Sequence, residues 1–308
     1  MSGAPNLPVF AKTPERMPPP VWWGPVLLLL GGFCIGFAPI GLKLSDMEPQ
    51  ATGLWRYIFS LPFLLLIALV VRRGRPPGRP PAAAIVAGVC FGLDIGLWHA
   101  GLTLTTVANA TFIVNLGNIG VGLAAWLVLK EKPTLIWAGA ALVAMVGAGF
   151  LSLGGQSAGG QGDLRGDALA FGAALLVSFY MVYAKQARNR MDAFSVLFWM
   201  TVTEVFVAAV LTAVTQEAFL PDSVEGFKWP FMLALVAQVA GQGLIILGLG
   251  MTPTAIAGIL VLIQPVTAAI VARFLFDQSL GPLQLLGAAL ILIGIALSQR
   301  KHRPRPVV

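Results

Sequence analysis

The chain has 308 residues, of which 57% are hydrophobic and only 11% are charged. Soluble domains carry about 25% charged residues, so this composition excludes an ordinary soluble domain and indicates a protein embedded in a lipid bilayer. The net charge of +7 is spread over short loops and a tail instead of forming one patch, so no nucleic-acid partner is expected.

Ten apolar segments are long enough to cross a bilayer, which takes about 20 residues. Each should be a helix, because a helix satisfies its own backbone hydrogen bonds in lipid. The prediction is an all-α integral membrane protein with ten transmembrane helices. The predicted spans are residues 24–43, 50–71, 82–103, 106–129, 134–153, 166–188, 194–215, 229–249, 253–275 and 280–299.

The loops carry charges of opposite sign on the two sides of this predicted bundle. Loops after the second, fourth and sixth spans hold most lysines and arginines, as does the basic C-terminal tail at residues 300–308. The alternate loops are acidic. Because positively charged loops stay in the cytoplasm, we expect both termini there and the chain in the cell inner (plasma) membrane. The polar, Pro-rich N-terminal tail at residues 1–23 lacks the layout of a signal peptide.

The ten spans divide into two similar sets of five. Gly-Ala-Ala-Leu occurs at residues 139–142 and again at 287–290, in the fifth and tenth spans. An odd number of crossings turns the second copy upside down. We therefore predict two inverted five-helix repeats at residues 24–153 and 166–299, joined by a Gly/Ser-rich linker at 154–165, with a binding site between them at the membrane midplane. Further matches keep the same order in both halves: Gly24 with Gly166, Lys43 with Lys185, Glu48 with Asp192, Trp55 with Trp199, and Glu131 with Asp277.

Three details of this plan carry a resemblance to a known family. An acidic residue follows the fourth span of each half (Glu131 and Asp277), the Gly-Ala-Ala-Leu helix comes next, and Arg56 lies in the second span. Over residues 24–299 the chain resembles the drug/metabolite transporter superfamily in its ten-helix EamA-type branch. Pro265 also fits that pattern, whereas Ile119 at the matching place and Asp277 in place of Glu depart from it. The resemblance implies a transporter most similar to the exporters of aromatic and other neutral amino acids.

Away from their ends, the predicted spans contain four acidic, basic or histidine side chains: Arg56, Asp94, His99 and Glu204. A charge at a span centre costs about 2.5–3.5 kcal/mol on insertion scales, so such residues face a partner or water. One interpretation is an ion pair of Arg56 with Glu204 or Asp94 that holds helices in register. The other is that Arg56 binds a substrate carboxylate while Asp94 and Glu204 take up protons. His99 either titrates near neutral pH or packs as a hydrogen-bonded residue.

Uncharged polar residues recur at helical spacing and predict the rest of a substrate-binding face. Amides suit the polar head of a zwitterion and aromatic rings suit its apolar side chain. The alternative is hydrogen bonding between helices, which is worth about 0.6 kcal/mol per contact. The predicted substrate-binding residues besides Arg56 and His99 are Trp98, Asn115, Asn118, Tyr180, Tyr183, Gln238, Gln242 and Gln264.

The sequence gives little support for enzyme chemistry. Residues 155–159 match the Gly-x-Ser-x-Gly elbow of hydrolases, but they lie in the linker without the strand and partners that this elbow needs. Asp94 and His99 point about 140° apart on a regular helix, which is a poor acid–base pair. No phosphate-binding loop, zinc spacing or haem attachment motif occurs, and the two cysteines lie in spans, so no catalytic residue, metal or cofactor is expected.

The sequence therefore predicts a secondary transporter that exports aromatic or neutral amino acids, or similar small metabolites, by alternating access. The expected partners are a small-molecule substrate and the lipid bilayer. The oligomeric state stays open, and a monomer is compatible with the sequence. A drug or nucleotide-sugar carrier of the same fold is the alternative, although nucleotide phosphates would need several cationic side chains in the cavity and only Arg56 qualifies. A membrane-embedded enzyme is the distant alternative.

Overall fold

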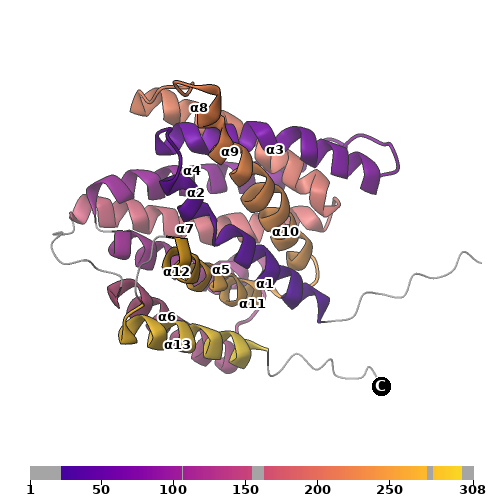
Figure 1. Cartoon of the computed structure of the whole chain (residues 1–308). Helices are drawn as coiled ribbons and strands as arrows, with labels where there is room; N and C mark the ends of the chain where they lie inside the picture. Colours follow the sequence, from indigo (N-terminus) through magenta and orange to yellow (C-terminus); the bar gives the residue numbers. More distant parts are fainter. Residues whose placement is uncertain (1–21, 106, 155–162, 276–279, 300–308) are drawn as a thin grey trace, which may run out of the picture.

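The computed structural model describes residues 22–105, 107–154, 163–275 and 280–299, and these residues are almost entirely helical (Figure 1). Both tails, most of the predicted linker and Asp277 lie outside the described residues. The first half contains α1 (Trp23–Ile35), α2 (Ala38–Lys43), α3 (Pro49–Val71), α4 (Ala82–Leu104), α5 (Val107–Leu129) and α6 (Leu135–Gly154).

The second half begins with two long helices, α7 (Leu164–Arg188) and α8 (Ala193–Thr215). Its eighth span is built from η1 (Val224–Phe227), α9 (Lys228–Leu233), η2 (Ala234–Gln242) and α10 (Gly243–Leu249). Its ninth and tenth spans are α11 (Thr254–Val261) with α12 (Ile263–Leu275), and α13 (Pro282–Ser298).

The predicted ten-helix membrane plan is confirmed. Within the described residues, nine helical segments are long and apolar enough to cross a membrane, and α13 is a shorter apolar helix of 17 residues. Helix ends follow local sequence. Pro49 begins α3, where a missing N–H does no harm. Asp192 precedes α8 and accepts a hydrogen bond from the Ser195 amide (2.9 Å), as expected of an N-cap.

The helices pair in the way that inverted repeats require. The fifth and tenth spans, α6 and α13, lie along one edge of the bundle, and the second and seventh, α3 and α8, lie along the opposite edge (Figure 1). Gly147 faces Gly287, while Gly294 faces Ala140 and Ala144, so α6 and α13 run antiparallel. A helix and its repeat counterpart run in opposite directions only if one repeat is upside down.

Two further contacts repeat with the halves exchanged. A Cβ placed on Gly101 would lie 3.2 Å from the carbonyl oxygen of Gly166, and one placed on Gly248 would lie 2.9 Å from that of Gly24. The sequence match of Gly24 with Gly166 thus corresponds to equivalent helix crossings. At these crossings only glycine lets the two backbones approach so closely.

Counterpart spans of the two repeats differ in helix regularity. The spans α4, α5 and α7 are continuous helices of 23, 23 and 25 residues, and we call them the continuous bundle. Their counterparts are interrupted: the first span breaks at Gly36 and Phe37, the ninth at Leu262, and the eighth contains the π-helix η2. These interrupted spans (α1, α2, α9, η2, α10, α11 and α12) contact one another, and we call them the jointed bundle.

Candidate functional site

Charged and polar side chains gather in the interior between helices of both halves. They are at most 7% exposed, although they lie in segments that are otherwise apolar. We call this set the buried polar cluster. Its members are Arg56 and Tyr57 on α3, Asp94 and His99 on α4, Tyr180 on α7, Thr201 and Glu204 on α8, and Gln238 and Gln242 on η2.

Arg56 is the cation of the cluster. Its Nη2 donates a hydrogen bond to the Tyr57 hydroxyl (2.8 Å), and its Nε has no partner. The guanidinium is within electrostatic reach of Asp94 and Glu204. Among the described residues, however, Arg56 forms no ion pair. The ion-pair interpretation of Arg56 therefore does not describe this structure, in which the guanidinium is held by a phenol.

Glu204 is held by an amide from another helix. The Gln238 Nε2 donates to Glu204 Oε2 (2.7 Å) and to Thr201 Oγ1 (2.9 Å). Thr201 lies one turn before Glu204, so both face the same neighbour. Within the part of the chain that the structure describes, two side-chain oxygens, Glu204 Oε1 and Gln238 Oε1, have no hydrogen-bond partner although both residues are fully buried. Buried polar atoms are nearly always paired, so these oxygens mark a site that is incomplete without a ligand, a proton or water.

Asp94 and Gln242 extend the cluster toward the continuous bundle. Asp94 Oδ1 and both polar atoms of the Gln242 amide have no hydrogen-bond partner. The Tyr180 hydroxyl lies near both side chains, and the Tyr180 ring packs on Phe91 with centroids 4.9 Å apart. His99 is buried with Nδ1 unpaired, and its ring lies beside that of Trp98 at 5.3 Å. Predicted site residues from five segments are thus brought together.

Other predicted residues stand apart from this cluster. Asn118 is buried and donates to Asn115 Oδ1 (3.3 Å) one turn away on α5, and its backbone faces Gly258 on α11. Tyr183 and Gln264 are half-buried, with Gln264 just after the break in the ninth span. Within the described residues, Asn118, Tyr183 and Gln264 form no hydrogen bond with a member of the cluster. Their role in binding stays a prediction.

Sequence reasoning missed Tyr57, Thr201 and the π-helix. The nine residues of η2 carry both glutamines of the cluster, and π-helical turns often occur at functional sites. Gly241 in the same segment packs against Cys34 and Ile35, so α1 lies close to it. The stretch Ala-Leu-Val-Ala-Gln-Val-Ala-Gly-Gln contains no residue that marks a change of helix type, so the sequence carried no signal for it.

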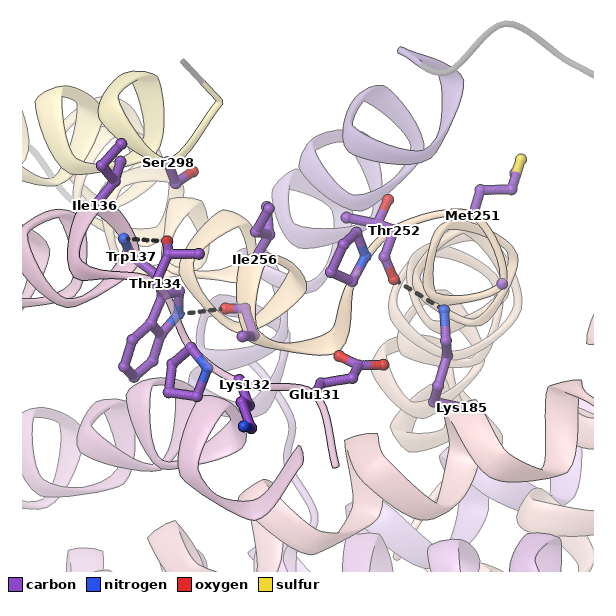
Figure 2. Close-up of a pocket in the computed structure, with 14 residues that line it drawn as sticks. Glu131, Lys132, Thr134, Ile136, Trp137, Lys185, Met251, Thr252, Ile256 and Ser298 are labelled. Atoms are coloured by element: carbon purple, nitrogen blue, oxygen red, sulfur yellow. Dashed lines mark hydrogen bonds between the residues drawn. The ribbon is translucent and has the colours of Figure 1, made fainter. Parts of the chain in front are cut away.

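A pocket of about 560 Å³ opens at one end of the bundle, on the side that the loop charges predict to be cytoplasmic (Figure 2). It lies between the α5–α6 loop and the α10–α11 turn. Glu131 accepts hydrogen bonds from the Thr254 amide (2.9 Å) and hydroxyl (3.2 Å) at the start of α11. Trp137 Nε1 donates to the Ala255 carbonyl (2.8 Å). These bonds join the first half to the jointed bundle.

Cations hold the other side of the same turn. The Lys185 ammonium donates to the carbonyls of Leu249 (2.5 Å) and Thr252 (2.9 Å), as Figure 2 shows for the latter. Arg188 Nε donates to the Ile246 carbonyl (3.2 Å). An acid at the start of α11 and bases at the end of α10 match the polarity of the helix dipoles. The charged groups of Glu131 and Lys185, which line the pocket, thus already have hydrogen-bond partners within the chain.

Loop carboxylates outside the spans also tie helices together. Glu217 accepts from the Ala51 amide at the start of α3 (2.9 Å), and partial burial raises the pKa of Glu217 above its usual value. Asp192 forms an ion pair with Arg72 (3.3 Å). Partial burial by itself raises the pKa of Asp192, but hydrogen bonds from Ser195 and Arg72 outweigh it and hold that pKa below its usual value.

Two inverted five-helix repeats around buried, unpaired polar groups define the class of secondary transporters. A profile of the EamA-like transporter family matches residues 22–153 and again residues 164–299. The chain therefore belongs to the EamA-like transporter family of the drug/metabolite transporter superfamily. It is a multi-pass protein of the cell membrane and not an enzyme.

Similar proteins agree with this assignment at the level of fold and class. The chain is 25% identical over 268 residues to a protein of Bacillus subtilis (strain 168) named "Uncharacterized transporter YwfM", covering 85% of this chain and 89% of that one. The chain also superposes on a solved structure described as "Crystal structure of protein", with a TM-score of 0.76 and 16% sequence identity. The superposition covers 90% of this chain and 96% of the other, and at that identity it supports the fold alone.

Proposed function

We propose that this transporter exports aromatic or other neutral amino acids, or small metabolites of similar chemistry, by alternating access. The observation that carries the proposal is the buried polar cluster, in which α3 and α4 of one repeat meet α7, α8 and η2 of the other. Groups shared between inverted repeats change their exposure when one repeat moves against the other. The direction of transport rests on the family resemblance.

The residues of the cluster suit a zwitterion. The free Nε of Arg56 is available to a carboxylate, while the carboxyl groups of Asp94 and Glu204, together with His99, are the proposed proton carriers. The rings of Trp98, Tyr180 and Tyr183 would enclose an apolar side chain. The amides of Asn115, Asn118, Gln238, Gln242 and Gln264 would provide neutral hydrogen bonds.

A lipophilic cationic drug is the second candidate, and the two buried carboxylates favour it. A nucleotide sugar fits less well, because its phosphates need cations. Arg56 is the cation of the cluster. Lys185 and Arg188 lie at the end of α7 and donate to backbone carbonyls of α10 and of the turn after it.

The decisive experiment is flux of labelled amino acids in proteoliposomes, with and without a proton gradient. We expect saturable flux of neutral amino acids that is accelerated by the gradient. Absence of saturable flux for every amino acid would reject the cargo, and flux that ignores the gradient would reject the proton role of Asp94, Glu204 and His99. Trp98→Ala and Asn115→Ala should weaken competition by cargo without reducing the yield of folded protein; equal loss of both would favour a packing role.

A further inference from the structure

The contact between Glu204 and Gln238 leaves two acceptor oxygens free. A carboxylate can only accept hydrogen bonds, so the amide nitrogen of Gln238 must be the atom that faces Glu204 Oε2 at 2.7 Å. The amide oxygen of Gln238 and the second oxygen of Glu204 then have no partner among the described residues. Both side chains are 0% exposed, so bulk water does not reach these atoms.

No cation among the described residues neutralises Glu204. Arg56 is within electrostatic reach but gives Nη2 to the Tyr57 hydroxyl and forms no ion pair. A proton on Glu204 Oε1 would remove the charge and turn that oxygen into a donor for the Gln238 oxygen, but it would leave the pair with no preference for an amine. A primary ammonium carries three N–H donors and a positive charge, so it can serve both free oxygens at once.

We propose that Glu204 and Gln238 form a subsite for the N–H donors of a ligand ammonium group. This inference rests on the proposed function and sharpens it: the cargo is a primary or secondary amine. A carboxylate on the same ligand would meet the free Nε of Arg56. The subsite therefore favours zwitterions and amines over carboxylic acids. It also rejects quaternary ammonium compounds, which carry the charge but no N–H donor.

Four probes that share a phenyl ring separate these possibilities: L-phenylalanine, 2-phenylethylamine, 3-phenylpropanoate and trimethyl(2-phenylethyl)ammonium. Binding is measured as the shift of the unfolding temperature of the purified full chain in detergent, over a range of probe concentrations. We expect the first two to bind at least tenfold more tightly than the last two. Equal binding of 3-phenylpropanoate and phenylalanine, or of the quaternary and primary amines, would overturn the subsite.

The variants locate the effect. Glu204→Gln should weaken binding of 2-phenylethylamine at least tenfold, and Gln238→Leu should weaken it severalfold. Glu225→Gln, at an exposed position of the short helix η1, is the matched control and should leave binding unchanged. If Glu204→Gln does not fold, the four probes on the unaltered chain still decide. The leucine series (L-leucine, 3-methylbutylamine and 4-methylpentanoate) repeats the comparison for an aliphatic cargo.

Flux and binding together distinguish failure of this inference from failure of the proposed function. One outcome is that Glu204→Gln leaves amino-acid flux unchanged and that neither amine competes with this flux. That outcome would reject the subsite but not the proposed export of amino acids. Amine binding that depends on Glu204 without any amino-acid flux keeps the subsite and rejects the amino-acid cargo. Failure of both amines to bind the unaltered chain rejects the subsite outright.

Discussion

The continuous bundle and the jointed bundle descend from the same five-helix plan but differ in how their helices are built. In the continuous bundle, α4, α5 and α7 run without interruption. In the jointed bundle the equivalent spans contain two breaks and a π-helix. Breaks and π-turns replace the regular hydrogen-bond ladder and are the places where a helix bends most easily. The two bundles therefore pack symmetrically although their helices differ in stiffness.

The two bundles also meet the buried polar cluster differently. The continuous bundle supplies Asp94, His99 and Tyr180 from regular helices, whereas the jointed bundle supplies Gln238 and Gln242 from the π-helix itself. A rocking motion that used the breaks would therefore move the two glutamines relative to fixed carboxyl and phenol groups.

The largest expected effect is steric. A Cβ on Gly117 of α5 would lie 2.8 Å from the Ala174 Cα of α7, backbone against side chain, inside the continuous bundle. Gly117→Leu should lower the free energy of unfolding by about 3 kcal/mol, since overpacking a rigid contact forces backbones apart. Thermal unfolding in detergent measures it. Gly139→Leu is the matched control, because no atom lies within 4 Å of a Cβ at that position.

A glycine of the jointed bundle can be compared directly with Gly117. Gly31 of α1 is also packed against backbone, since its Cβ would lie 2.7 Å from the Gly241 carbonyl oxygen of η2, although a Cβ on Gly117 would come closer still to the Ala174 carbonyl oxygen. We expect Gly31→Leu to cost about 1 kcal/mol, because the interrupted helices around it can shift. Equal losses for Gly117→Leu and Gly31→Leu would show that the jointed bundle is as stiff as the continuous one.

The next effect concerns acids that cap a helix from a distant segment. Glu131 caps α11 through the Thr254 amide and hydroxyl, and Glu217 caps α3 at the opposite end of the bundle through the Ala51 amide. Removing a cap typically costs about 1 kcal/mol and up to about 2 kcal/mol. Glu131→Ala should reach the upper value and Glu217→Ala the typical one in thermal unfolding. A larger loss for Glu217→Ala would contradict the view that the turn before α11 is the more strongly anchored.

The break in the ninth span is expected to affect the rate of transport. Pro265 has no N–H to donate to the carbonyl four residues earlier, Val261, and so preserves the break at Leu262. Pro265→Ala lets the ninth span become continuous. We expect about a threefold slower flux, equivalent to about 0.6 kcal/mol in the barrier, with no loss of thermal stability. Pro62→Ala, in the unbroken helix α3, should leave the flux unchanged. Unaltered flux in Pro265→Ala would show that the break at Leu262 takes no part in the rocking motion.

Much of the fold was predictable because it depends on local pattern. Apolar length predicted the spans, and the order of Gly24 with Gly166 and Gly139 with Gly287 predicted two repeats whose inversion the antiparallel α6 and α13 confirm. Burial of Arg56, Asp94 and Glu204 followed from their place in apolar segments.

The partners of the buried and capping residues were not predictable, because the choice among possible partners depends on how the helices are arranged. Arg56 bonds to the neighbouring Tyr57 and not to a carboxylate, and Glu131 bonds to Thr254, which is 123 positions away. The residues of the π-helix η2 likewise carry no signal for its helix type. The sequence therefore identified which side chains needed a partner but not which partner each one found.

The smallest expected effect tests the loop that joins α7 of the continuous bundle to α8. Asp192→Asn keeps the cap of α8, because Asn caps helices as well as Asp does, but it removes the charge that pairs with Arg72. Both side chains are partly exposed, so we expect a loss of only about 0.5 kcal/mol at pH 7. The folded-state pKa of Asp192 lies below its usual value of 3.8, so this contribution is present above about pH 4 and fades as the pH falls through the lower folded-state value. The gap in unfolding temperature between the unaltered chain and the variant should therefore be constant from pH 7 to 5 and close toward pH 3. Asp222→Asn, in an exposed loop, should show no gap at any pH. A gap that widens on acidification would mean that the charge of Asp192 destabilises the folded chain.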